Sequence, residues 1–594
     1  MKRNFLFCLI IILLTLLAYF NSFENSFQYD DIHVIERNPF VKDPSRIPQF
    51  FVDPQLGSGI YTETSSYRPL LMATFALNHA WGGMNVFGYH LLNFFLHLLC
   101  TILVYFVILH IFRFTNLPGE VDSLRYSLMA LFAALIFGLH PVQTESVTYI
   151  NGRASSLTGL FFLASFLAYM QYRLTPKIQY LLLSSLAYAC ALSVKETGIT
   201  LFAILLLFNV MFPHGSNFKN RCLSLIPHFL LTFLYLILRV YFFGPLQYGS
   251  RPLRPLYDHL LSQSRAWVHY LGTLVLPLNL NINYDFPVSH SILESQVMFS
   301  IFILAALSWM IWRFSRSSRL IGFFALWFAI TLSPTNSVIA LEDLVCDRWI
   351  YLSSVGYAVL LALAAGWIFQ KRVEAGGRAG KIVFFSLCAL VVELYGYSTL
   401  LRNFDWTSPR TLWEDAVAKA PRNARAYTSL GVALVSQDRL EDGARRFRQA
   451  IALEPRGGQA YLNLGYVYSL QGDYDKAIEY YEQAIPLSPK LLPEIYNNLG
   501  LAYLNRGKME ESEKYLRRAI EIRPHIAAPH YNLGLYFEKR GDIDQAISYH
   551  EKANKLDPDY HLPYNALSRL YKIKGWSEKS QEAYQNFLKY SSRR

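Results

Sequence analysis

The sequence contains few cysteines for its length, and they are not arranged as metal or disulfide sites. Six cysteines occur among 594 residues, most of them in or beside apolar runs, and none lies after residue 400. There is no Cys-x-x-Cys pair and no Cys/His spacing typical of structural zinc. The sequence therefore predicts neither a disulfide framework nor a zinc module, and cysteine usage does not indicate a redox compartment.

Charged residues are also scarce, and their distribution argues against a nucleic-acid-binding protein. Only 16% of the residues are charged, although the formal net charge is +12. Much of the basic excess lies in short loops between apolar runs, and no block rich in Lys and Arg has interleaved aromatic residues. We therefore expect no nucleic acid among the partners.

Long apolar runs dominate the first 400 residues, and the apolar share of 53% is high for a soluble protein. Several runs are shorter than the roughly 20 residues that a bilayer requires, so their ends must extend into flanking residues. The sequence predicts a polytopic α-helical membrane domain with about 11 spans, at residues 5–20, 88–112, 126–139, 155–172, 178–194, 197–212, 223–243, 298–313, 319–333, 349–369 and 382–400.

The first run lacks a cleavage site, although Lys2 and Arg3 before an apolar core are typical of a signal peptide. We expect an uncleaved first span whose N-terminus lies in the cytoplasm. The loops after even-numbered spans are then cytoplasmic, and they fit the positive-inside rule. An odd number of spans places the C-terminal part on the outer face. The basic residues of these loops are Arg113, Arg125, Arg173, Lys177, Lys219, Arg221, Arg313, Arg316, Arg319, Lys371, Arg372, Arg378 and Lys381.

The last part of the chain is an internal repeat. Prolines recur at positions 421, 455, 489, 524 and 558, and glycines at 431, 465, 500 and 534. This period is that of the tetratricopeptide repeat, which stacks helix pairs into a solenoid with a concave groove for peptides or partner proteins. We predict an all-α chain with a membrane domain at 1–402, a linker at 403–422 and four clear repeats plus a degenerate fifth at 423–594.

Two adjacent carboxylates, Asp30 and Asp31, follow the first apolar run. Acids beside a membrane span can act as a general base, as metal ligands or as both. They can also cap a helix or mark the membrane surface without any chemical role. The pair alone does not decide between these alternatives.

Further motifs complete a recognisable pattern. It resembles the transmembrane and tetratricopeptide-repeat O-mannosyltransferases, which have a GT-C glycosyltransferase fold, over nearly the whole chain. The sequence has Ser353-Ser354 where that family usually has Pro-Ser. The matching stretches are Tyr29-Asp30-Asp31 with Asn38, Tyr67-Arg68-Pro69-Leu70, residues 82–97, His140-Pro141-Val142-Gln143-Thr144-Glu145, Gly152-Arg153-Ala154, Lys195-Glu196-Thr197-Gly198, Leu238-Arg239, residues 347–356 and Asn403-Phe404-Asp405-Trp406.

The resemblance implies transfer of a sugar, mannose in that family, from a polyprenyl-phosphate-linked donor to a Ser or Thr hydroxyl of an acceptor protein on the outer face. Asp30 or Asp31 would serve as the base. Arg348, Arg68 and Arg153 are candidates for the donor phosphate, since guanidinium groups suit phosphate; Arg239 and Arg265 are further outer-facing arginines. Candidate pocket residues are His90, His140, Glu145, Lys195 and Glu196.

Several questions stay open at this level. A divalent metal ion is possible, and the sequence does not decide it. The acceptor could instead be a glycan or a lipid, or the protein could be a non-catalytic membrane scaffold whose repeats recruit partners. A bacterial cytoplasmic membrane with periplasmic repeats is the more economical location; in a eukaryote the membrane would be that of the endoplasmic reticulum.

Overall fold

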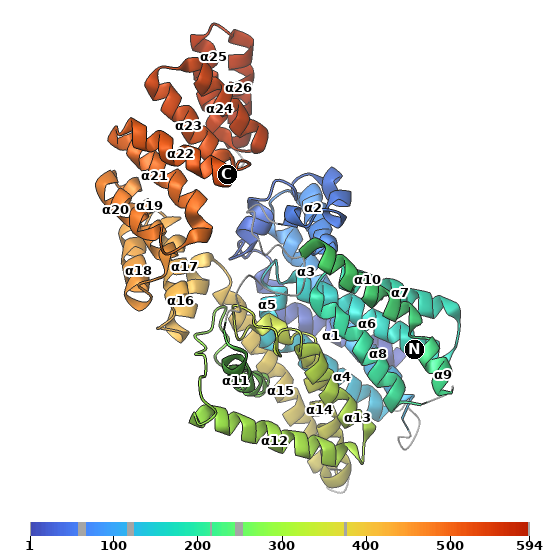
Figure 1. Cartoon of the computed structure of the whole chain (residues 1–594). Helices are drawn as coiled ribbons and strands as arrows, with labels where there is room; N and C mark the ends of the chain where they lie inside the picture. Colours follow the sequence, from blue (N-terminus) through green and yellow to red (C-terminus); the bar gives the residue numbers. More distant parts are fainter. Residues whose placement is uncertain are drawn as a thin grey trace. The chain divides into compact units, whose positions relative to one another are not determined.

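The computed structural model describes residues 2–57, 67–115, 124–213, 217–243, 254–373 and 377–591. These described residues form helices and loops without a β-strand, as the all-α prediction requires. The chain divides into two compact units, Met1–Asp415 and Ala416–Arg594 (Figure 1). The last three residues of the predicted repeat domain, 592–594, lie outside the described residues.

Each of the predicted apolar runs of the first unit contains a helix. Among the residues that the structure describes, seven helical stretches are long and apolar enough to cross a membrane, and an eighth results if α4 and the short helices after it form one span bent by 49°. Three further apolar helices, α7, α13 and the stretch Glu196–Met211, are shorter than a full span. The helices are α1 (Lys2–Tyr19), α3 (Val86–Phe112), α4 (Leu124–Leu139), α6 (Arg153–Leu174), α7 (Ile178–Leu192), α8 (Thr200–Met211), α10 (Ile226–Phe243), α12 (Ser295–Ser315), α13 (Arg319–Leu332), α14 (Ser353–Ile368) and α15 (Gly377–Asp405).

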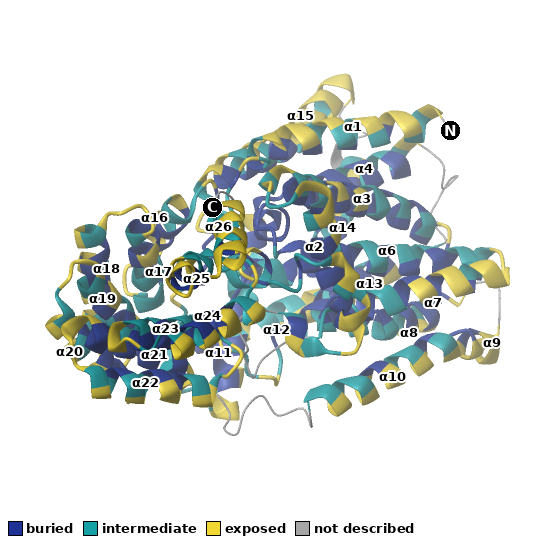
Figure 2. Cartoon of the chain, turned by 90° about the horizontal axis from the view of Figure 1, so that it is seen from above, coloured by how far each residue is buried: buried dark blue, intermediate teal, exposed yellow. Residues whose placement is uncertain are grey.

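The structure thus supports seven or eight candidate spans rather than the eleven expected, because the shorter helices do not reach the bilayer thickness by themselves. The α10, α12 and α15 windows are only 22%, 11% and 11% buried, and their exposed residues include large apolar ones such as Phe233, Phe302 and Leu387. Figure 2 colours much of these helices as exposed or intermediate. Exposed apolar surface on this scale suits contact with lipid rather than with water. The first unit is therefore a multi-pass membrane unit.

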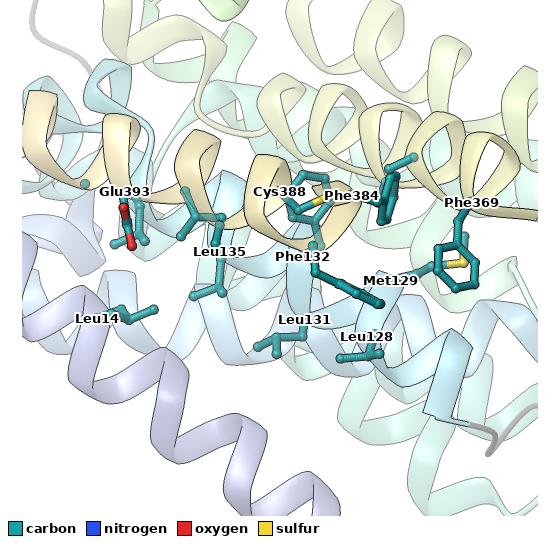
Figure 3. Close-up of a pocket in the computed structure, with 18 of the residues that line it drawn as sticks. Leu14, Leu128, Met129, Leu131, Phe132, Leu135, Phe369, Phe384, Cys388 and Glu393 are labelled. Carbon is teal, nitrogen blue, oxygen red and sulfur yellow. The ribbon is translucent and has the colours of Figure 1, made fainter. Parts of the chain in front are cut away.

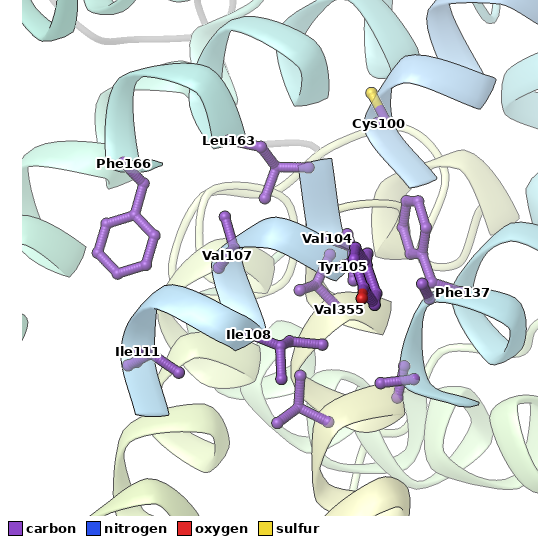
Figure 4. Packing of buried hydrophobic residues seen from close by; sticks show 14 of the residues in the cluster. Cys100, Val104, Tyr105, Val107, Ile108, Ile111, Phe137, Leu163, Phe166 and Val355 are labelled. Atoms are coloured by element: carbon purple, nitrogen blue, oxygen red, sulfur yellow. The ribbon is translucent and has the colours of Figure 1, made fainter. Parts of the chain in front are cut away.

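A continuous apolar core joins α3, α4, α6, α13 and α14. Figure 4 shows the part of this core where Val104, Tyr105 and Ile108 of α3 meet Phe137 of α4 and Val355 of α14. Small residues allow close approach: a Cβ at Gly138 would lie 2.6 Å from the Thr101 side chain. The core fixes the ends of these helices, from which the polar loops of the unit emerge.

Two polar connections carry the segments of interest. Between α1 and α3 lie short helices at Ile32–Glu36, Pro44–Phe51 and Pro54–Gly57, followed by α2 (Pro69–Gly82), and these pack around a separate apolar cluster. Between α4 and α6 lie a 3-10 turn at Pro141–Gln143 and α5 (Thr144–Val147). The helix α11 (Leu256–Val275) follows α10.

The second unit is a stack of helix pairs with the predicted period. Glycines sit where the paired helices are closest: a Cβ at Gly431 would lie 2.5 Å from the Phe447 ring, and one at Gly465 would lie 2.7 Å from the Tyr481 ring. The pairs are α17 (Ala424–Val435) with α18 (Leu440–Leu453), α19 (Gly458–Leu470) with α20 (Tyr474–Ala484), α21 (Leu492–Arg506) with α22 (Met509–Ile522), α23 (Ala527–Arg540) with α24 (Ile543–Leu556), and α25 (His561–Ile573) with α26 (Ser577–Ser591).

The stretch predicted as a linker is mostly helical. It contains the end of α15 and the helix α16 (Pro409–Lys419). The division between the compact units falls inside α16, between Asp415 and Ala416. The apolar runs that dominate the first 400 residues thus end close to the change of unit, but the residues that follow them form a helix and not a loop.

Candidate functional site

The segment that carries the two adjacent acids is held against the end of α15. Asn25 Nδ2 donates to the carbonyl of Asn403 at 3.2 Å, and Gln28 Nε2 donates to the carbonyl of Trp406 at 3.1 Å. Each bond joins residues 378 positions apart. The position of the acids is therefore set by the tertiary fold and not by their own short segment.

Tyr29, directly before the acids, has a left-handed backbone with φ of 50°. This conformation is uncommon for a residue other than glycine, and strain of this kind gathers at functional sites. The Tyr29 ring packs against two aromatic rings, with centroids 5.7 Å from Trp413 and 6.3 Å from Tyr149. The packing supports the turn, after which Asp30 and Asp31 enter different surroundings.

Asp31 is completely buried and acts as an acceptor for the backbone. Its Oδ2 accepts the N–H of Gln28 at 3.0 Å, and its Oδ1 accepts the N–H of Asn151 at 2.8 Å. Burial raises the pKa of Asp31 well above its ordinary value, whereas these two hydrogen bonds and the charge of Arg153 oppose the rise. Both oxygens of Asp31 are thus engaged: Oδ2 closes a turn within its own segment, and Oδ1 joins that segment to the loop before α6.

Asp30 is the more accessible acid, since its side chain is 33% exposed. Its backbone N–H donates to the hydroxyl oxygen of Tyr149 at 3.2 Å, and its Oδ1 lies 4.0 Å from Nε2 of His33. The Asp30 charge acts on Tyr149 and on Arg348, so these three residues are close together. Burial, reinforced by Asp30 and Asp31, raises the pKa of Tyr149 well above its ordinary value, so that its phenol stays protonated.

Arg348 is paired with Glu145 through both its main chain and its side chain. Its N–H donates to Glu145 Oε2 at 2.9 Å, and its Nη1 forms an ion pair with Glu145 Oε1. Glu145 also accepts a hydrogen bond from Cys346 Sγ at 3.3 Å. The Arg348 side chain remains 22% exposed while that of Glu145 is 3% exposed, so Glu145 orients the guanidinium from behind.

A short hydrogen-bond chain links Lys195 to Arg348. The Lys195 Nζ donates to Ser155 Oγ at 3.0 Å, and the Ser155 hydroxyl donates to the carbonyl of Arg348 at 3.2 Å. Burial and the nearby charges of Arg68 and Arg348 lower the pKa of Lys195 to about 8. Arg68, whose charge acts on Lys195, has a side chain that is about one quarter exposed, and it forms an ion pair with Glu196 at 3.3 Å.

The site contains a partly exposed carboxylate, Asp30, whose charge acts on Arg348, and a group of cations in which Lys195 interacts with Arg348 and Arg68. A carboxylate beside a hydroxyl substrate can remove its proton. Clustered ammonium and guanidinium groups can bind a phosphate and stabilise it as it leaves. The geometry therefore suits the attack of a hydroxyl on a carbon that carries a phosphate leaving group.

Comparisons with known proteins agree with this chemistry. The tetratricopeptide repeat family matches residues 429–491 and again residues 491–558. Protein O-mannosyl-transferase TMTC3 of Mus musculus is 26% identical over 495 residues, which cover 75% of this chain and 51% of the relative. Protein O-mannosyl-transferase Tmtc3 of Drosophila melanogaster is 24% identical over 523 residues, which cover 75% of this chain and 55% of the relative. The chain is a distant homologue of these protein O-mannosyl-transferases.

The chain spans about half the length of the curated relatives it matches. A solved structure, the crystal structure of a thermophilic TPR protein from Thermus thermophilus, matches at 23% identity and a TM-score of 0.27, covering 29% of this chain and 92% of that chain. The homology supports a glycosyltransferase at the level of the family.

One predicted phosphate ligand does not fit that role. Arg153 is completely buried at the start of α6. Its Nε donates to Asn93 Oδ1 at 2.6 Å, its Nη1 to Thr74 Oγ1 at 3.1 Å and its Nη2 to the carbonyl of Tyr89 at 3.1 Å. The guanidinium is used to join α2, α3 and α6, and it stabilises the buried carboxylate of Asp31. We therefore leave Arg153 out of the phosphate site of this O-mannosyl-transferase homologue.

The two predicted pocket histidines are also structural. His140 is 1% exposed, its Nδ1 accepts the N–H of Val142 at 3.2 Å and its Nε2 bonds to the carbonyl of Leu274 at 2.9 Å. His90 is 2% exposed and bonds to the carbonyl of Asn25 at 2.8 Å. Both rings thus connect loops to helices through hydrogen bonds to the main chain, and both are almost completely buried.

The described residues offer no evident metal site, because no three His, Cys, Asp or Glu side chains gather there. Asp30 and Asp31 point to different surroundings, and Glu145 is occupied by Arg348. The side chains that are present do not fit a bound divalent ion, and we derive no step through one.

A separate apolar cavity of about 730 Å³ lies between α1, α4, α14 and α15. Figure 3 shows Leu14, Phe132, Met129, Phe384 and Phe369 along it, with Glu393 near one end. Arg125 and Glu393 are the charged residues in a lining that is otherwise almost entirely apolar. Such a lining suits a hydrocarbon chain rather than a polar substrate.

Sequence reasoning missed Tyr149, which bonds to the main chain of Asp30, and Ser155, which links Lys195 to the main chain of Arg348. Both lie in the loop and first turn around Gly152-Arg153, a stretch that carries the family resemblance. No spacing rule singles out either hydroxyl. The only indication in the sequence was that both residues lie close to the Gly152-Arg153-Ala154 motif.

Proposed function

We propose that the chain is an integral-membrane glycosyltransferase that moves a sugar, mannose by homology, from a polyprenyl-phosphate donor to a Ser or Thr hydroxyl of an acceptor protein. The observation that carries this proposal is the accessible carboxylate of Asp30, whose charge acts on Arg348, together with the hydrogen bonds that link Arg348 to Lys195 through Ser155. The homology to protein O-mannosyl-transferases supports it.

Asp30 acts as the general base, and Asp31 positions it. Asp30 removes the hydroxyl proton of the acceptor while the oxygen attacks the anomeric carbon of the sugar. The bond between that carbon and the phosphate oxygen breaks, and the electron pair leaves with the polyprenyl phosphate. Direct displacement of this kind inverts the anomeric centre. Asp31 is unsuited to be the base because two backbone N–H groups occupy its oxygens.

Lys195, Arg348 and Arg68 hold the donor phosphate. The Arg348 and Arg68 guanidinium groups are each oriented by a carboxylate, Glu145 and Glu196, and keep exposed surface for a ligand. Lys195 donates to a neutral hydroxyl, that of Ser155, so its positive charge is the least compensated of the three. The leaving phosphate gains negative charge during the reaction, which these cations stabilise.

The transferase domain comprises residues 1–402, with a GT-C fold of eleven spans in which the three short helices cross the bilayer together with their flanking residues. The positive-inside pattern then places the N-terminus in the cytoplasm and the Asp30 loop on the outer face. Residues 403–422 connect this domain to the repeats at 423–594, which lie on the outer face as well. For a bacterial protein this is the periplasmic side of the cytoplasmic membrane.

The repeats bind the acceptor protein. Tetratricopeptide stacks bind extended peptides in their concave groove, and the repeats match that family over residues 429–558. In this proposal the groove selects the acceptor, while the chemistry belongs to the first unit.

The test is transfer of radiolabelled mannose from polyprenyl-phosphate mannose to protein, in membranes that contain the wild type, Asp30→Asn or Glu36→Gln. Glu36 is an exposed carboxylate in the same segment and serves as the matched control. We expect protein-linked label with the wild type and Glu36→Gln, and at least about a 100-fold loss with Asp30→Asn at equal expression.

Other outcomes point to the alternatives. Label that appears in lipid or free glycan, but not in protein, would replace the protein acceptor by one of these. Absence of transfer from every lipid-linked sugar tested would favour a membrane scaffold. Full transfer by Asp30→Asn would refute Asp30 as the base.

A further inference from the structure

The segment that leads to Asp30 lies along the corner between α15 and α16. The N–H of Ser26 donates to the carbonyl of Thr407 at 3.3 Å. Gln28 Nε2 donates to the carbonyl of Trp406 at 3.1 Å. Trp406 and Thr407 follow the last residue of α15 and precede α16. Because these bonds go to the main chain of the corner, the corner fixes the backbone that precedes the proposed base.

Two tryptophan rings extend these contacts into the site. Trp413 of α16 meets the Tyr29 ring edge-on, with the centroids 5.7 Å apart and the planes at 64°. Trp406 stacks on the Tyr149 ring, with the centroids 5.6 Å apart and the planes at 24°. The Tyr149 hydroxyl oxygen in turn accepts the N–H of Asp30 at 3.2 Å. One ring therefore contacts the residue before the base, and the other supports the residue that binds the main chain of the base.

The Trp413 contact matters because Tyr29 has a conformation that needs support. Its φ of 50° is in the left-handed region, which a residue other than glycine adopts at a cost that its surroundings must offset. Trp413 is 4% exposed and Tyr149 is 1% exposed, so the Tyr29 ring packs against two buried rings. Since Asp30 follows directly, a backbone rotation at Tyr29 would displace its carboxylate.

The helix that carries Trp413 is itself attached to the end of α15. Asp415 of α16 forms an ion pair at 2.5 Å with Arg402, which is 6% exposed and also pairs with Asp405 at 2.8 Å. Leu412, beside Trp413, is completely buried. These contacts give the Trp413 ring a defined place against the turn that precedes the base.

The position of the Asp30 carboxylate depends on its backbone. Among the described residues, none donates a hydrogen bond to this carboxylate, and Nε2 of His33 in the same segment lies 4.0 Å away. A general base must lie within hydrogen-bond reach of the proton that it removes, and a misplacement of about 1 Å can lower the rate about 100-fold. The contacts that fix the backbone at Tyr29 therefore matter for the rate of proton transfer.

We propose that Trp413 is a positioning residue for the base of the transferase. Its ring holds the left-handed turn at Tyr29, and the turn holds the Asp30 carboxylate where it meets the acceptor hydroxyl. Trp413 acts through Tyr29 and not on the substrate itself. The inference rests on the function proposed above, and it assigns a role in that function to α16, the helix that continues into the repeat unit.

The activity test measures protein-linked label in membranes at a series of concentrations of polyprenyl-phosphate mannose and at equal expression. Trp413→Leu should lower the apparent kcat about 10–100-fold with an unchanged KM for the donor, since the base acts in the transition state. Trp413→Phe keeps an aromatic edge and should lose about 2–5-fold. The matched control is Trp309→Leu on the lipid-facing α12, whose side chain is 62% exposed and which should transfer sugar like the wild type.

A double variant separates positioning from a general loss of stability. If Trp413 acts through Tyr29, the substitution Trp413→Leu should lower kcat no further in a chain that already carries Tyr29→Leu. Equal losses of kcat in the wild-type and Tyr29→Leu backgrounds would mean that the two residues act independently, which would overturn the proposal.

Hydrogen exchange of the full chain tests the same contact without any transfer. Trp413→Leu and Tyr29→Leu should each speed exchange of the amides of residues 29–31 at least about tenfold, whereas Trp309→Leu should leave it unchanged. A wild type that transfers no sugar would refute the proposed function, and exchange would then still decide whether Trp413 holds the Asp30 segment. Unchanged exchange in Trp413→Leu, or a kcat equal to that of the wild type, would overturn the proposal. If Trp413→Leu does not fold, Trp413→Phe should show the same changes at a smaller size, and its identity with the wild type would overturn the proposal instead.

Discussion

In residues 416–594, charged side chains lie on helix surfaces and pair with neighbours three or four positions away, as in Arg439 with Asp442 and Arg517 with Glu513. In residues 1–415, Asp31, Arg153 and Lys195 are all at most 8% exposed. Exposed pairs contribute little to stability, whereas a buried charge is costly unless its partners are built around it.

The two units therefore use their charged residues differently. The repeats derive their stability from small residues and packed rings between paired helices, so that their surface charges can vary. The membrane unit contains buried charges at the ends of its helices, although burying a charge lowers the stability of the fold. Buried charges of this kind are typical of functional sites. This contrast supports the assignment of catalysis to the first unit and of recognition to the second.

The largest effect is expected when the buried ion pair of the membrane unit is broken. Glu145→Gln leaves Arg348 without its carboxylate and should cost about 3–5 kcal/mol of stability. Thermal unfolding in detergent would measure this. The double variant Glu145→Gln with Arg348→Gln should lose less than the single variant, because no uncompensated charge is left. A single variant as stable as the wild type would show that Glu145 does not hold Arg348.

The next effect concerns the charge of Lys195. Its pKa is lowered to about 8, so the ammonium is charged below that pH and loses its proton as the pH rises through it. The KM for the lipid-linked donor should therefore rise above about pH 8, by about 10–100-fold at the limit, because one charge-assisted hydrogen bond to phosphate is worth about 1.5–3 kcal/mol.

The matched variant for this titration is Lys195→Arg, whose guanidinium stays charged at every pH of interest. Its KM for the donor should not change between about pH 7 and pH 9. A wild-type KM that is equally constant over this range would mean that Lys195 does not contact the phosphate.

Within the repeats, an overpacked helix contact should lower the free energy of unfolding by no more than the broken Glu145–Arg348 pair does. Gly431→Ala places a Cβ 2.5 Å from the Phe447 ring and should cost about 1–3 kcal/mol. Adding Phe447→Leu removes the ring atoms that clash with the new methyl group. The double variant should therefore lose less free energy of unfolding than the two single variants lose in total. Simple additivity in thermal unfolding would show that the helices separate to accommodate the methyl group.

The smallest effect is expected for a surface pair of the repeats. Arg517→Gln removes the ion pair with Glu513, whose side chain is 27% exposed, and should cost at most about 0.5 kcal/mol. Transfer activity should not change. A loss comparable with that of Glu145→Gln would contradict the contrast between the two units.

The helices were predictable because their signals are local or repeated. The proline and glycine period alone placed the repeat pairs, and each apolar run of the first unit contains a helix. The number of spans was less certain, since α7, α8 and α13 are too short to decide by length. The helix α16 inside the predicted linker has no period or apolar run that would mark it.

The site was only partly predictable, because adjacent residues in the sequence have different surroundings in the fold. The partly exposed Asp30 and the buried Asp31 both follow the turn at Tyr29, and this turn packs against the distant Trp413 and Tyr149. The roles of Arg153 and His140 likewise depend on remote partners, such as Asn93 and the carbonyl of Leu274. No rule on spacing contains this information.

The most direct test of Asp30 as the base is steady-state transfer by the purified full chain in lipid vesicles, with polyprenyl-phosphate mannose titrated against the wild type, Asp30→Asn and Asp31→Asn. We expect Asp30→Asn to lower kcat at least about 100-fold with little change in the KM for the donor, because the base acts in the transition state. Asp31→Asn should instead lower thermal stability, through the lost backbone acceptor. An Asp30→Asn enzyme with normal kcat, or one that differs from the wild type in KM alone, would contradict the claim that Asp30 is the base.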